Sequence, residues 1–367
     1  MENRKSRIII DDSKDVDGFT LESILPQQLG KIIIRGKLTS FEESFHNSAK
    51  EILSLFNCSN INNLLIIFHE NKEIEIFEDN FLIITTFIPK RNIEKGGAVY
   101  HNDIVDIVAL SFHDGNNEIS LKPGEKIIFI FRYNFAFGLY FDLTRKTHPN
   151  IIYKELAQLY RKVAYADIFN ALNKGVIESL INIGWFPFIE IIGREHETLF
   201  SSIKENKKEL ITLWIENSFP KDRIDKLVDK WWLKRQYREK KELITEGINC
   251  YINGQYFASI STLIPMVEGL VNTHNIQNVG KGVGYGSSDI TNKLNEITTG
   301  TFENDSLTLP GQFKIYLDKY YFKHNKGAIS GEAVRNTVSH GRAQNESFTK
   351  ENTLKVILTL DQIWHYF

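Results

Sequence analysis

The chain has 367 residues, of which 42% are hydrophobic and 25% are charged, and its formal net charge is −2. This is the composition of a globular protein with room for two or three domains, and it excludes a collagen-like or low-complexity chain. The near-neutral charge also excludes a strongly basic overall field, so any nucleic-acid site must be a local patch.

The two cysteines, Cys58 and Cys250, lie far apart and have neither disulfide-framework nor zinc-site spacing, which suits a reducing compartment. The N-terminal residues contain only a short apolar run, Ile8–Ile10, so we expect no signal peptide. No apolar stretch approaches the ~20 residues that span a bilayer. We therefore expect a cytoplasmic protein without membrane contact.

Residues 1–148 are predicted to form an antiparallel β-rich domain. Runs of β-branched and aromatic residues recur there at roughly 8–12-residue intervals, separated by turn signals. The runs are Lys31–Leu38, Leu64–His69, Glu73–Phe77, Phe81–Phe87, Ile104–Phe112, Lys126–Tyr133 and Phe137–Leu143. One helix is predicted within the domain, at Phe41–Phe56, from its helical apolar spacing.

This domain is expected to bind a ligand or to pack against a partner. Aromatic residues alternate along Phe131–Phe137, which favours burial in the core over an exposed groove. Histidine and acidic residues such as His69-Glu70 and His113-Asp114 are scattered on predicted turns. Residues scattered in this way are usually solvated, so we predict no metal site.

Residues 149–237 are predicted to form a helical linker domain, because His148-Pro149 marks a break and the apolar period then becomes helical. Helices are expected at Ile151–Asn173, Glu197–Asn217 and Lys221–Lys241. The aromatic stretch Trp185–Phe188 could stack on a nucleobase, but packing between helices is the favoured interpretation.

Basic and aromatic residues alternate toward the end of this region. Trp231, Trp232 and Tyr237 are interleaved with six cations, which are Lys230, Lys234, Arg235, Arg238, Lys240 and Lys241. Such a mixture favours an RNA-binding surface, with Lys234, Arg235 and Arg238 as candidate contacts. A solvated helix face with a buried tryptophan pair is an equally good interpretation.

Residues 238–367 are predicted to be a helical bundle. Its first helix should end near Ile252, and the next should run from Gln255 to Thr273. Glu268 lies on the apolar stripe of the second helix, where a carboxylate needs a partner. We predict that this partner is Arg335; the alternative is that Glu268 borders solvent at the bundle edge.

A glycine-rich segment, Asn275–Asp289, follows. It has no preceding strand, so it fails the context required of a dinucleotide or phosphate-binding loop. A plain connector is favoured, although Lys281 could reach a phosphate from it. Further helices are expected at Ile290–Thr298 and Gln312–Phe322.

The segment Gly331–Gly341 is predicted to form a short helix that carries Arg335, Asn336 and His340. Asn336 and His340 are four residues apart and share a face. A histidine can move protons near neutral pH, and an arginine fork matches a phosphate. These groups suit metal-free RNA cleavage, whereas the alternative on spacing alone is a solvated helix end.

The pattern Arg-Asn-x-x-x-His-Gly resembles the signature of HEPN-domain ribonucleases. The stretches 256–270 and 349–360 resemble the helices that precede and close the motif in that family. The resemblance covers roughly the last third of the chain. Together with the preceding predictions it implies an α+β multidomain fold, with an N-terminal antiparallel β-rich domain and a helical region that ends in a HEPN-like bundle.

The resemblance implies a metal-independent endoribonuclease that needs no cofactor, of the kind found in anti-phage defence and among toxins. His340 would be the acid or base, Arg335 would stabilise the phosphorane, and Asn336 would position one of them. Glu268 would orient the arginine, and Arg342 would contact a phosphate. The alternatives are a catalytically silent module that binds RNA or protein, or a β-domain receptor with a helical dimerisation domain.

The terminal helix, Lys350–Phe367, has apolar residues on two sides and therefore needs two partners. One should be its own bundle, and the other a second domain or a second copy. Since HEPN ribonucleases typically dimerise through this region, the resemblance implies a homodimer with RNA as its partner. The N-terminal domain would then sense a trigger ligand or a phage protein.

Overall fold

The described part of the chain falls into two compact units. Residues 1–87 and 107–166 form the first, and residues 88–106 and 167–367 form the second. The predicted division into three domains stays a prediction. Besides three short N-terminal strands, the computed structural model describes residues 62–71, 73–79, 81–133, 136–142, 149–172, 174–192, 195–205, 207–283, 290, 292–297, 306–322, 338 and 343–367.

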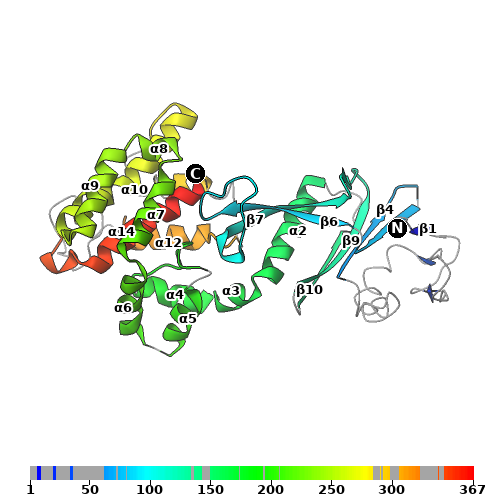
Figure 1. Ribbon diagram of the computed structural model, residues 1–367, viewed down its shortest axis with the longest axis horizontal. Coiled ribbons are helices and arrows are strands. Elements are labelled where there is room, and N and C mark those ends of the chain that lie inside the picture. Colours follow the sequence, from blue (N-terminus) through cyan, green and yellow to red (C-terminus); the bar gives the residue numbers. More distant parts are fainter. Residues whose placement is uncertain are drawn as a thin grey trace. The chain divides into compact units, whose positions relative to one another are not determined.

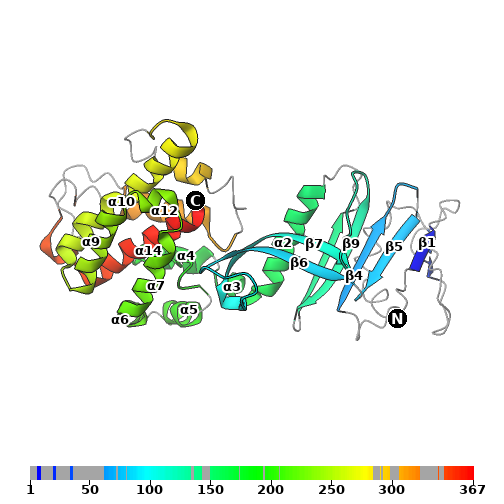
Figure 2. The same ribbon diagram turned by 45° about the horizontal axis from the view of Figure 1, so that its top comes forward.

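An antiparallel five-stranded sheet organises the first unit, as the spacing of apolar runs predicted. Its strand order is β1-β5-β4-β9-β10, and Figures 1 and 2 show the strands side by side. The strands are β1 (Ser6–Ile9), β4 (Asn63–Phe68), β5 (Glu73–Glu78), β9 (Lys126–Tyr133) and β10 (Ala136–Asp142). Strand β4 is a continuous apolar run and is buried from Leu64 to Phe68, because it pairs with β5 and β9 on either side.

Two smaller sheets and a helix complete the described part of the first unit. One sheet pairs β2 (Thr20–Leu21) with β3 (Ile34–Arg35), and the other has the order β6 (Leu82–Pro89), β7 (Ile104–Asp114), β8 (Asn117–Glu118). Helix α2 (Pro149–Ala164) packs against β10. The predicted helix at Phe41–Phe56 lies outside the described residues.

A continuous row of aromatic rings forms the core of this unit. Phe112 and Phe129 have ring centroids 4.9 Å apart, Phe129 and Phe131 are stacked at 5.1 Å, and Phe131 meets Tyr160 of α2 at 5.1 Å. Rings at these separations add orientation-dependent attraction to their burial. Phe131 is buried, which confirms the prediction for this residue, whereas Tyr133 is partly exposed. Phe135 and Phe137 are not tested, because their side chains lie outside the described part of the chain.

The second unit is helical. Its helices are α3 (Ala166–Ala171), α4 (Lys174–Asn182), α5 (His196–Lys204), α6 (Lys208–Ser218), α7 (Lys221–Trp231), α8 (Arg235–Arg238), α9 (Lys241–Ile252), α10 (Tyr256–Val279), α12 (Pro310–Tyr320) and α14 (Lys350–Tyr366), with short 3-10 turns at His101–Asp103 and Asn345–Ser347. No helix among the described residues is long and apolar enough to cross a membrane.

Several predicted helices differ from those observed. The helix predicted at Ile151–Asn173 is divided into α2 and α3, and the one predicted at Glu197–Asn217 is divided into α5 and α6. The helix predicted at Lys221–Lys241 breaks after Trp231 into α7 and α8; after this break the Tyr237 hydroxyl donates to Leu360 O at 2.6 Å. The helix predicted to end at Thr273 continues to Val279. It ends where Gly280 adopts φ +78°, a conformation that glycine favours at a helix C-terminus.

Helix α14 is the centre of the second unit and is buried from Thr353 to Tyr366, with Lys355 the only residue in that span left partly exposed. Its first turn is capped by the Thr349 hydroxyl, which accepts from Asn352 N at 3.1 Å. The neighbouring helices α6, α7, α9 and α10 all contact it (Figure 2). Both of its apolar stripes are therefore covered within the same unit, so this helix gives no argument for a second copy.

One glutamine joins α14 to two segments that are far away in sequence. Gln362 Oε1 accepts the Ile189 N–H at 2.9 Å, and its Nε2 donates to Thr308 O at 3.0 Å. The Tyr366 hydroxyl donates to the same Thr308 carbonyl at 2.6 Å. Gln362 and Tyr366 are both buried. Their side chains therefore supply the hydrogen bonds that water cannot give to the Ile189 N–H and the Thr308 carbonyl.

We expect Gln362→Leu to lower the free energy of unfolding of the second unit by about 1–3 kcal/mol, because it leaves the Ile189 N–H buried without an acceptor. All five tryptophans lie in this unit, so urea unfolding followed by tryptophan fluorescence measures its stability. Gln255→Leu, at an exposed position, is the matched control and should change little. Equal effects of the two substitutions would contradict the role of Gln362.

Candidate functional site

The predicted catalytic positions cannot be placed. Arg335, Asn336, His340 and Arg342 lie outside the described residues. Glu268 is described, on α10, where its side chain is partly exposed. The pairing of Glu268 with Arg335 therefore stays a prediction.

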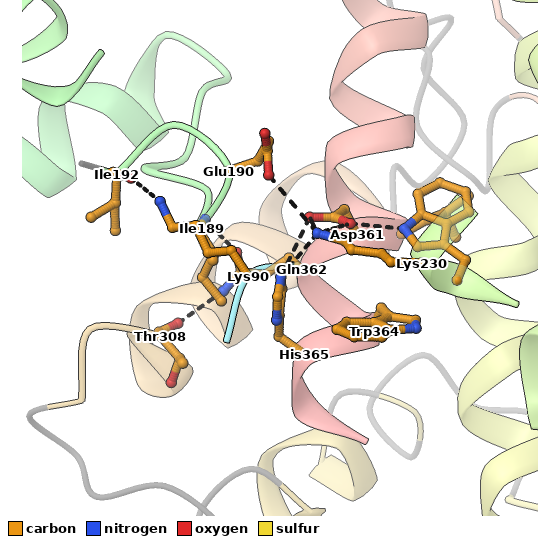
Figure 3. A network of polar contacts seen from close by, with 12 residues as sticks. Lys90, Ile189, Glu190, Ile192, Lys230, Thr308, Asp361, Gln362, Trp364 and His365 are labelled. Atoms are coloured by element: carbon orange, nitrogen blue, oxygen red, sulfur yellow. Dashed lines mark hydrogen bonds and ion pairs between the residues drawn. The ribbon is translucent and has the colours of Figure 1, made fainter. Parts of the chain in front are cut away.

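A cluster of charged side chains lies where α7 meets α14 (Figure 3). Lys230 Nζ is 2.9 Å from Asp361 Oδ1 and 3.3 Å from His365 Nε2. The Trp231 indole N–H donates to the same carboxylate at 2.7 Å. Side chains of Asp361 and His365 are 1% and 0% exposed, so this Lys230–Asp361–His365 cluster is sealed from solvent.

A second layer of charges continues the cluster away from α14. Glu190 lies 3.8 Å from Lys230 Nζ and 3.3 Å from Arg223 Nε, and Arg223 reaches Glu195 at 2.5 Å. Lys90 donates to the backbone oxygen of Ile192 in the adjoining turn (Figure 3). Cations and carboxylates thus alternate, which lowers the cost of burying each of them.

The pKa values follow from burial and from these neighbours. Burial alone would raise the pKa of Asp361, but Lys230, His365 and Trp231 together hold it well below its usual range. Burial and the Lys230 charge lower the pKa of His365 to about 4, so its imidazole is neutral at pH 7. Burial also lowers the pKa of Lys90 to about 8, against the opposing effect of Glu190.

The neutral imidazole fixes how the histidine bonds. Lys230 can only donate, so His365 Nε2 accepts and Nδ1 carries the proton. Nδ1 is buried and has no hydrogen-bond partner among the described residues. With no solvent access for a substrate, the Lys230–Asp361–His365 cluster can orient α14 against α7, but it cannot perform acid–base chemistry on a bound ligand.

The sequence analysis did not identify this cluster, although one signal was present. Asp361 and His365 are ionisable residues four apart in the mainly apolar second half of the terminal helix, and buried charges of this kind need partners. Their partner Lys230 was instead grouped with the cations of a possible RNA-binding surface. Its side chain is 6% exposed, so that grouping was wrong for Lys230.

The candidate RNA contacts around α8 differ in their exposure to solvent. Lys234 is part-buried: it donates to Trp364 O at 2.5 Å and lies 4.3 Å from the centroid of the Trp364 ring, and burial lowers its pKa to about 8. It thus stabilises the C-terminal end of α14. Arg235 and Arg238 are exposed, and Arg235 pairs with Glu239 at 3.0 Å.

The loop after α10 presents Lys281 to solvent. Asn275 Nδ2 donates to Lys281 O at 2.8 Å, and Asn272 Oδ1 accepts the Val283 N–H at 2.8 Å. These two asparagines attach the loop to the end of α10 while the Lys281 residue stays exposed. Lys281, Arg235 and Arg238 are thus available to a polyanion.

His274 lies near the end of α10 and is partly exposed. Its ring stacks on Phe367 at 4.3 Å, and Asn278 Nδ2 lies 3.2 Å from its Nε2. Partial burial, followed by the charges of Lys234 and Lys293, lowers the pKa of His274. This lowered pKa favours the neutral imidazole at pH 7.

Within the described ranges, no group of three or more histidine, cysteine, aspartate or glutamate residues could hold a metal ion. Comparison with known proteins gave no relatives. No family model, no curated protein and no solved structure matches the chain.

We expect Asp361→Asn to lower the free energy of unfolding by about 3–5 kcal/mol, because it removes the nearer of the two carboxylates that face the buried Lys230 charge. The matched control is Glu239→Gln, which breaks the exposed pair with Arg235 and should cost less than about 1 kcal/mol. Urea unfolding monitored by tryptophan fluorescence at pH 7 measures both. A loss for Asp361→Asn no larger than that of the control would contradict the buried ion pair.

The lowered pKa of His365 predicts that the stability of the folded chain depends on pH. Because its folded pKa of about 4 lies below the ordinary value of 6.5, the unfolded chain binds a proton that the folded chain excludes. Its contribution to stability is full above pH 6.5 and is lost as the pH falls toward 4. In His365→Gln the urea midpoint should therefore fall less between pH 6.5 and 4.5 than in the wild type. If the urea midpoint falls equally in His365→Gln and in the wild type over this pH range, the titration of His365 does not contribute to stability.

Proposed function

We propose that the chain is a metal-independent endoribonuclease. The observation that carries this proposal is the Arg335-Asn336…His340 motif followed by glycine, with the spacing of HEPN-type ribonucleases. Helices α10 and α14 support it, because they lie on the two flanking stretches that resemble the family. The exposed cations Arg238, at α8, and Lys281 support RNA as the partner.

The reaction is an in-line displacement at phosphorus. The ribose 2′-OH attacks the adjacent phosphate, the bond to the 5′ oxygen breaks, and the products carry a 2′,3′-cyclic phosphate and a 5′-OH. His340 takes the 2′-OH proton or gives one to the leaving oxygen. Arg335 places its donors on the equatorial oxygens where charge develops, and Asn336 orients one of the two.

Supporting residues complete the proposed site. Glu268, on α10, would hold the Arg335 fork, and Arg342 would contact a flanking phosphate. If two copies associate through the helical unit, as in the family, the two motifs would share one cleft. A role in anti-phage defence or as a toxin follows from the resemblance alone, and the first unit would then be the sensor.

Cleavage of labelled RNA by the purified full-length protein in EDTA tests this proposal. We expect cyclic-phosphate products from the wild type and a loss of at least about 100-fold in rate for Arg335→Ala and for His340→Ala. The control is His113→Ala, which alters a histidine of the first unit and should leave the rate unchanged. Cleavage that survives His340→Ala, or that requires a divalent metal, would exclude this mechanism.

A further inference from the structure

A polar pocket lies in the first unit, where the turn between β4 and β5 meets the turn that precedes β9. The register places Phe68 opposite Lys126, so His69 and Glu125 continue the same pairing beyond the strand ends. The pocket has a volume of about 420 Å³ and is lined by His69, Glu70, Asn71, Lys122, Pro123 and Glu125. This volume is within the range of small-ligand sites.

The histidine in this pocket is held by a buried carboxylate. Glu125 is 6% exposed, its Oε1 lies 2.7 Å from His69 Nδ1, and its Oε2 accepts the Lys122 N–H at 2.7 Å. A carboxylate accepts, so His69 Nδ1 donates and the ring orientation is fixed. His69 Nε2 is 3.6 Å from Glu75 Oε2, too far for a hydrogen bond, and is therefore available to a ligand placed beside it.

A second carboxylate is packed against the opposite turn. Gly124 has φ +89°, and a Cβ at this position would lie 2.3 Å from Glu70 Oε1. Any residue other than glycine would be strained there and would displace the Glu70 side chain. The glycine turn thus lets the Glu70 carboxylate lie close against the pocket wall.

The charges select the class of ligand. Glu70 and Glu125 line the pocket and Glu75 lies beside His69, whereas Lys122 is the single cation of the lining. Pro123 is its one apolar lining residue, which disfavours an apolar ligand. An anion would meet the carboxylates, and a divalent metal is disfavoured because no three-ligand group occurs in the described residues.

We propose that this pocket binds a ligand through an ammonium or guanidinium group, with Glu70 as counter-charge and His69 Nε2 as acceptor. Charge-assisted hydrogen bonds to carboxylates supply both affinity and orientation. The group can belong to a free amine or to the side chain of a peptide, since the pocket is open to solvent at His69, which is 27% exposed. This inference does not depend on RNA cleavage.

Isothermal titration calorimetry of the full-length protein tests it with agmatine, spermidine and a blocked Gly-Arg-Gly peptide. We expect saturable binding of at least one cationic probe, weakened roughly tenfold or more by Glu70→Gln. Binding of agmatine alone would indicate a free small molecule, and equal binding of the peptide would indicate recognition of the guanidinium wherever it is attached.

Glu118→Gln is the matched control, because Glu118 is an exposed glutamate of the same unit outside the pocket lining. Circular dichroism of each variant confirms folding. No saturable heat with any cationic probe would overturn the proposal. So would equal weakening by Glu118→Gln, or tighter binding of inorganic phosphate than of the amines.

Discussion

The complete burial of α14 is the constraint on which the second unit depends. This helix carries Asp361, Gln362, His365 and Tyr366 into the interior, and each polar group there must find a partner or cost stability. Lys230 and Trp231 on α7 bond Asp361, while Ile189 and Thr308 bond Gln362. A shift of α14 by one residue would break all of these contacts together, so the network specifies one packing arrangement.

The same network limits where chemistry can occur. Lys230 and Lys234 belong by sequence to a basic stretch, yet one is sealed beside Asp361 and the other is held against the end of α14 by Trp364. Arg238 and Lys281 are not part of this network and remain exposed. The proposed catalytic segment, residues 331–341, falls between α12 and α14 in the chain, and both helices are anchored in the core through Phe313 and Tyr366.

Different physical devices stabilise the two units. Stacked aromatic rings and a continuous apolar strand form the interior of the first unit, whereas buried charge pairs set the register of helices in the second. The first unit therefore keeps its histidine and carboxylates at its strand ends, where a ligand can reach them. The second buries the equivalent groups and uses them for packing. This contrast supports the proposed division of roles, in which the first unit recognises a ligand and the second cleaves RNA.

Local sequence predicted the longer strands and most helices, because alternation of apolar residues and helical spacing are properties of neighbouring positions. It did not predict the short strands β1, β2 and β8. It also predicted that Trp185–Phe188 and Phe131 are core residues, as the structure confirms. Sequence alone did not give the partners of Asp361 and His365, since Lys230 is 131 residues away from Asp361. Nor did it show that α14 is covered on both sides by its own unit, or that two turns bring His69, Glu70 and Glu125 together. Those contacts depend on tertiary packing, because they join segments that are far apart in the chain, and the residues next to each segment do not indicate its partner.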